Sequence, residues 1–214
     1  MARNKYPEET VEAILNAAYR LFLEKGYDNA SLQDIMDATG LSKGAIYHHF
    51  KSKEDIFLTI CGRIGAENAR ILGEIRDDKS LTGLEKLQTI FRAALSRSHN
   101  HTLMNMRPYL LRNPRFLALQ IQDIYQEVAP RYIQPILEQG AADGTLSVAH
   151  PKEAAEAIML LANVWLNPLL LPTTEEEVLA RGEVFLRLME GLGIQAFGPE
   201  LVDAYLGYVR PPEA

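Results

Sequence analysis

The stretch LSKGAIYHHFKSKED, at residues 41–55, carries hydrogen-bond donors within an acidic chain. The 214 residues contain 22 Lys and Arg against 28 Asp and Glu, a net charge of −6. Between Asp37 and Glu54 no carboxylate occurs, and the basic side chains there are Lys43, His48, His49, Lys51 and Lys53. Ammonium and imidazole groups donate to phosphate oxygens and to the acceptor atoms of bases. The stretch is therefore either a solvated helix face or the binding surface for an anionic partner.

A helix at 43–50 would turn several of these groups outward. Ile46 and Phe50, at spacing i and i+4, would face inward. Short or donor-bearing side chains near the N-terminus of such a helix can reach base edges in the major groove of DNA. The outward residues would be Lys43, Gly44, Ala45, Tyr47 and His48.

Further donors flank this helix. Lys51 and Lys53 stand where the following helix begins, and ammonium groups beside free backbone N–H groups make a phosphate site. Ser31 and Ser42 each precede a helix and could turn a hydroxyl to phosphate. Gln33 faces away from the apolar side of its helix, which favours an additional contact.

Helix caps predict the elements that hold these residues. Ser31 with Asp34 three positions later has the capping-box spacing that begins a helix. Gly40 suits the left-handed conformation that ends one, and Ser42 caps the next. Residues 31–50 are therefore predicted to form a helix-turn-helix.

Charge alone does not decide between the two interpretations of the lysines. Residues 1–53 contain seven basic and seven acidic side chains, and residues 54–214 contain 15 and 21. The N-terminal part is thus less acidic than the rest but is not basic. Because a short run of lysines on a helix is commonly a solvated face, spacing and charge leave both interpretations open.

The remaining sequence has helical spacing almost throughout and little strand alternation. Helices are predicted at 53–76, 84–102, 152–170 and 175–192, with kinks at Pro130 and Pro135 in the segment between the second and third. The fold class is therefore all-α. The most apolar segment, 158–172, is too short to span a bilayer, and one cysteine, Cys61, suits a reducing compartment. We expect a cytoplasmic protein that makes no membrane contact.

The segment SLQDIMDATGLSKGAIYHHFKSKEDIF, at 31–57, resembles the DNA-binding signature of the TetR family of bacterial transcriptional regulators. The resemblance extends upstream through AAYRLFLEKGYDNAS and covers the first fifty to sixty residues. Met36 and Thr39 depart from it, since small alanines are more usual there. It implies DNA contacts from Ser31, Gln33, Lys43, Gly44, Ala45, Tyr47, His48, His49 and Lys53, besides the cap Ser42.

The resemblance also implies a domain organisation and a mechanism. A three-helix helix-turn-helix domain would occupy 1–52, and a larger helical ligand-binding and dimerisation domain would occupy 53–214. The helices near 152–170 and 175–192 would form a homodimer, which the first of them supports independently, because it is apolar around most of its circumference. A larger intrachain core is the alternative. The family role is usually that of a repressor, released from a pseudopalindromic operator by a small-molecule effector.

Candidate effector contacts come from an inward helical stripe that turns polar. Leu87, Phe91 and Ala94 continue at helical spacing into polar residues. The stripe continues into Ser98 and His101, and it reaches Asn105 if the helix runs on. Tyr109 is a further candidate outside the stripe, and Trp165 would be an apolar wall of the pocket.

The sequence leaves two alternative functions open. His99 and His101 could belong to a helical metalloenzyme, but spacing i, i+2 points two helical side chains to nearly opposite sides. No catalytic, nucleotide or metal motif is present, so no enzyme activity, cofactor or metal site is expected. The other alternative is a ligand- or partner-binding module with weak DNA affinity, which the neutral N-terminal part favours.

Overall fold

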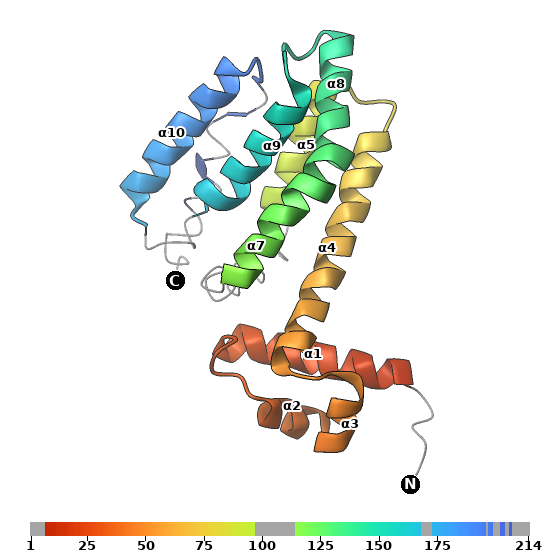
Figure 1. Cartoon of the computed structure of the whole chain (residues 1–214). Helices are drawn as coiled ribbons and strands as arrows, with labels where there is room; N and C mark the ends of the chain where they lie inside the picture. Colours follow the sequence, from red (N-terminus) through yellow and green to blue (C-terminus); the bar gives the residue numbers. More distant parts are fainter. Residues whose placement is uncertain are drawn as a thin grey trace. The chain divides into compact units, whose positions relative to one another are not determined.

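The computed structural model describes residues 7–96, 114–167, 173–195, 197–198, 202–203 and 206, and within these ranges every regular element is helical. The chain forms two compact units, Met1–Asn68 and Ala69–Ala214. The all-α class predicted from the sequence is confirmed (Figure 1). The predicted domain boundary at 52/53 stays a prediction, since the two units divide inside a continuous helix.

The first unit contains α1 (Pro7–Lys25), α2 (Leu32–Thr39), α3 (Lys43–His49) and the first part of α4 (Lys53–Asp77). Each helix contributes at least one fully buried apolar side chain to this unit: Ile14 and Phe22, Ile35, Ile46, and Ile56 and Phe57. Because α2 and α3 are only eight and seven residues long, this burial holds them more than their own hydrogen bonds do.

The second unit contains the remaining elements: α5 (Gly83–Ser96), α7 (Pro114–Asp123), η1 (Ile124–Ile133), α8 (Gln134–Asp143), α9 (Pro151–Leu160), η2 (Leu161–Trp165) and α10 (Glu175–Gly191). One apolar core joins them, with Leu87, Ile133, Leu137, Ile158 and Phe185 fully buried. Gly83 permits the close packing of α5 on α8, because a Cβ there would lie 2.3 Å from Gly140 Cα. None of the described helices is long and apolar enough to cross a membrane.

The predicted interruptions at Pro130 and Pro135 occur as a change of helix type. Residues 124–133 form a π-helix, in which the Gln134 N–H donates to the Ala129 carbonyl. Pro135 has no N–H to donate to the Arg131 carbonyl four residues earlier. Arg76 Nη1, from the end of α4, donates to that carbonyl instead, at 2.8 Å.

Lys86 on α5 also bonds to this end of α4. Only 4% of this residue is exposed, and its ammonium donates to the Arg76 carbonyl and to Gln139 Oε1, each at 2.6 Å. A buried ammonium is stable only when hydrogen bonds replace its water. Arg76 and Lys86 therefore fix the end of α4 to η1, α5 and α8.

Candidate nucleic-acid interface

The turn between α2 and α3 has the caps expected from the sequence. Gly40 takes a left-handed conformation, with φ 68°, and its N–H donates to the Met36 carbonyl at 2.8 Å. Ser42 Oγ then accepts the Ala45 N–H at 3.2 Å and begins α3. Leu41 lies between them. Local hydrogen bonds that the sequence encodes therefore determine where α2 ends and where α3 begins.

The outward face of α3 is built from the residues predicted for it. Ile46 and Phe50 are buried, whereas Lys43, Gly44, Tyr47 and His48 are exposed and Ala45 and His49 are half-buried. Tyr47 is 47% exposed, so its ring and hydroxyl lie on the outward face of α3. Its ring centroid lies 5.7 Å from Lys43 Nζ, so ammonium and phenol lie on one surface. The His48 and His49 ring centroids are 4.9 Å apart, edge to face.

At Gly44 no side chain projects from the outward face of α3. A Cβ built on its backbone would meet nothing within 4 Å, so packing inside the chain does not require glycine here. Its absent side chain leaves the backbone of α3 open to an approaching partner. The first turn of α3 contains no acidic residue that would repel phosphate.

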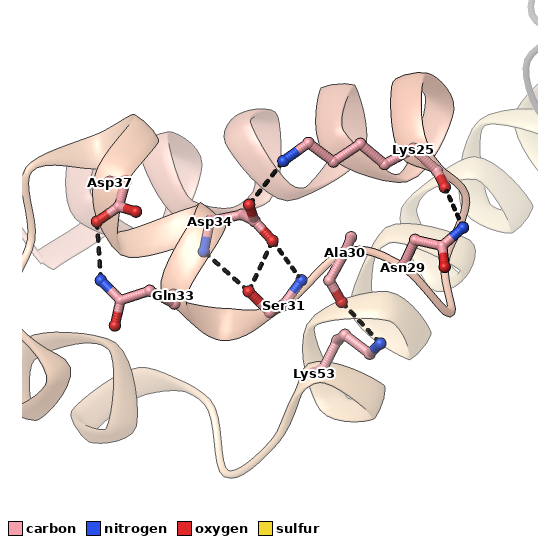
Figure 2. A network of polar contacts seen from close by, with 8 residues as sticks. All are labelled: Lys25, Asn29, Ala30, Ser31, Gln33, Asp34, Asp37 and Lys53. Carbon is pink, nitrogen blue, oxygen red and sulfur yellow. Dashed lines mark hydrogen bonds and ion pairs between the residues drawn. The ribbon is translucent and has the colours of Figure 1, made fainter.

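The start of α2 is a closed network of hydrogen bonds (Figure 2). Ser31 Oγ accepts the Asp34 N–H at 3.1 Å and donates to Asp34 Oδ2 at 2.6 Å, while the Ser31 N–H donates to the same oxygen. Lys25 Nζ lies 2.6 Å from Asp34 Oδ1. The hydrogen bonds from Lys25 and then Ser31 lower the pKa of Asp34 well below its usual range. The carboxylate therefore stays ionised and keeps the cap at neutral pH.

Gln33 and Ser31 remain accessible beside this network. Both side chains are exposed, and Gln33 Nε2 donates to Asp37 Oδ1 at 2.8 Å (Figure 2). The second amide hydrogen of Gln33 is free of that bond. A phosphate hydrogen bond from the Ser31 hydroxyl would have to replace its bond to Asp34.

Lys53 has surroundings that the sequence did not reveal. Its ammonium is directed at backbone carbonyls of the loop between α1 and α2, 2.7 Å from the Tyr27 oxygen and 2.8 Å from the Ala30 oxygen. Lys51, two residues earlier, is exposed. A periodicity argument could not separate these two lysines, because their difference comes from a segment 23 to 26 residues away.

All of the predicted effector contacts stay predictions. Ser98, His101, Asn105 and Tyr109 lie outside the described residues, as does His99. Trp165 lies on η2 with 36% of its surface exposed. Among the side chains that are described, no group of three His, Cys, Asp or Glu could hold a metal ion. Burial raises the pKa of the Cys61 thiol to about 12, so it is not a thiolate at neutral pH.

Comparison with known proteins agrees with this geometry. Residues 14–60 match the family model described as bacterial regulatory proteins, tetR family. The chain is similar to the HTH-type transcriptional repressor AcnR of Corynebacterium glutamicum, with 38% identity over 35% of this chain and 39% of AcnR. It is also similar to the repressor BepR of Brucella suis, with 51% identity over 26% of each chain. The matched region thus spans about two fifths of AcnR and a quarter of BepR.

Similarity of fold extends further than similarity of sequence. GusR of Salmonella enterica superposes with a TM-score of 0.63 over 90% of this chain and 99% of its own, at 20% identity. The reduced form of NemR from E. coli gives 0.61 over 86% and 96%, at 16% identity. At these identities the likeness describes the fold and not the ligand.

Proposed function

Since this chain belongs to the TetR family of bacterial regulatory proteins, we propose that it is a dimeric repressor that binds an operator through α3 and leaves it when a small molecule binds. The observation that carries the proposal is the outward face of α3. Short, exposed and donor-bearing residues lie there on a helix whose other face is buried in the first unit. No catalytic step is part of the proposal.

The residues of α3 would divide into base and phosphate contacts. Lys43 and Tyr47 carry donors suited to base edges, and Gly44 and Ala45 allow the helix to enter the groove. His48 and His49 at the end of α3, together with Ser31, Gln33 and Ser42, would contact the phosphate backbone. Backbone contacts of this kind fix the register in which α3 reads bases.

The α10 surface supports a dimer. Val178, Phe185 and Met189 are buried within the chain. Val184 and Leu188 on α10 are 47% and 45% exposed, and Leu192, the C-cap that continues its last turn, is 37% exposed. Spacing i, i+4, i+8 places these three in one stripe, here called the α10 stripe. A contiguous exposed apolar stripe marks an interaction surface. A second copy related by a twofold axis would cover the stripes of both copies at once.

The switch would act through α4. This helix runs without interruption from Lys53 to Asp77. At its start Lys53 contacts the loop before α2, and near its end Arg76 donates to the Arg131 carbonyl of η1. A small molecule bound among the helices of the second unit would move that end of α4 and so change the spacing of the two α3 helices. Such a ligand must bind the two conformations with different affinities, because a ligand with equal affinity for both leaves their populations unchanged.

Selection of duplexes from random DNA by the purified protein tests the proposal. We expect an inverted repeat whose half-sites are about one helical turn apart. The logarithm of the association constant should fall linearly with the logarithm of salt concentration, with a slope of about −0.9 for each phosphate contacted. Selection without any recurring sequence, or binding that salt does not weaken, would instead favour a module whose role is not DNA recognition.

A further inference from the structure

The ammonium of Lys53 occupies a site made of carbonyl oxygens. It lies 2.7 Å from the oxygen of Tyr27, 2.8 Å from that of Ala30 and 3.4 Å from that of Asp28. Figure 2 shows the side chain reaching from α4 to Ala30. A lysine ammonium has three hydrogens to donate, and here each has a carbonyl acceptor.

An aromatic ring completes this site. Lys53 Nζ lies 4.4 Å from the centroid of the Tyr27 ring. That ring packs against Phe57 of α4, at 4.9 Å, and against Phe22 of α1, at 5.4 Å. A cation over a tyrosine ring is stabilised further when water is partly excluded. The Tyr27 ring is therefore fixed by packing against α1 and α4, and its face contacts the Lys53 ammonium.

The carbonyls belong to the segment that determines where α2 begins. Ala30 immediately precedes Ser31, the N-cap of α2, and its N–H donates to the Gly26 carbonyl at 3.2 Å. Asn29 Nδ2 donates to the Lys25 carbonyl at the end of α1. Without a cation, the oxygens of Tyr27 and Ala30 would lose their short hydrogen bonds to Lys53.

We propose that Lys53 is a positioning residue that fastens the first turn of α4 to the loop before α2, and that it does not itself bind phosphate. This inference rests on the proposed function for its role in DNA binding. A phosphate bond from Nζ would have to replace one of its three carbonyl bonds, and the two short ones, at 2.7 and 2.8 Å, keep the ammonium directed at the loop. Lys53 thus joins the first turn of α4 to the residue that directly precedes the N-cap of α2.

Lys53→Met tests the proposal, with Lys51→Met as the matched control on an exposed lysine. Hydrogen exchange of the free protein reports on positioning without any DNA. In Lys53→Met we expect the amides of residues 30–35 to exchange roughly tenfold faster, the effect of losing hydrogen bonds to a charged group. Lys51→Met should leave them unchanged.

The salt dependence of operator binding then separates positioning from phosphate contact. Lys53→Met should weaken binding while keeping the parent slope, whereas loss of a phosphate contact makes the slope shallower by about 0.9 for each Lys53 in the complex. A shallower slope, or unchanged exchange at 30–35, would overturn the proposal. Should Lys53→Met fail to fold, the exchange rate of the Lys53 ammonium protons with water in the wild-type protein tests the proposal. We expect slow exchange, and fast exchange would overturn the proposal.

If no operator is found, the exchange measurements still stand. Unchanged amide protection in Lys53→Met refutes the positioning role itself. Failure to select any DNA refutes the proposed function and leaves the fastening of α4 to the loop as a property of the free protein. The two failures are therefore distinguishable.

Discussion

Gly44→Glu is expected to lower operator affinity at least about a hundredfold without unfolding the protein. Two carboxylates in the dimer would face phosphates and base edges, and like charges brought together in an interface cost several kcal/mol. Inside the chain the new side chain meets no obstacle, since a Cβ at this position has nothing within 4 Å. Glutamate is also a better helix former than glycine and is favoured in a first turn. Operator titration and thermal unfolding measure the two effects.

Gly65→Glu is the matched control for this prediction. Gly65 is an exposed, helical glycine on α4 that also has nothing within 4 Å of its built Cβ, so the charge and the packing change are the same. Operator affinity should stay within a few-fold of the parent. Equal losses in both variants would mean that net charge, and not the face of α3, controls binding.

Leu188→Glu is expected to convert the dimer to a monomer and, through that, to remove tight operator binding. The α10 stripe would place this residue beside its counterpart on the twofold axis, where two buried carboxylates repel each other and lose their water. A monomer contacts one half-site only and loses the effective concentration that joins the two. Analytical ultracentrifugation gives the mass, and operator titration gives the affinity.

Leu119→Glu is the control for the dimer prediction. Leu119 lies on α7 and is 45% exposed, the same fraction as Leu188, so both changes put a charge in place of an equally exposed leucine. It should remain dimeric. A dimeric Leu188→Glu would show that the α10 stripe is not the interface.

Local signals explain why the first unit could be predicted in detail. Ser31, Asp34, Gly40 and Ser42 act on their immediate neighbours, so their spacing along the chain defines where α2 and α3 begin and end. The inward direction of Ile46 follows from helical period alone. For this reason the outward face of α3 can be predicted from the sequence alone.

Long-range contacts explain what the sequence did not reveal. In the sequence Lys53 does not differ from other lysines at helix starts. Its ammonium bonds to carbonyls of the loop at 27–30, which only the folded chain brings close to it. The π-helical form of η1 likewise depends on packing around Pro130, although the proline itself predicted an interruption. The roles of Ser98, His101, Asn105 and Tyr109 stay predictions, because they lie outside the described residues.

The central claim is that α3 reads the operator, and the most direct measurement is the affinity of Lys43→Ala and Tyr47→Ala for the selected operator and for unrelated duplex DNA. Each lost base contact should cost about 1–3 kcal/mol in discrimination, roughly five- to 150-fold. We predict that the ratio of operator to non-specific affinity falls by at least about fivefold in each variant while the dimer persists. If both variants bind the operator as the parent does, α3 is not the helix that reads it.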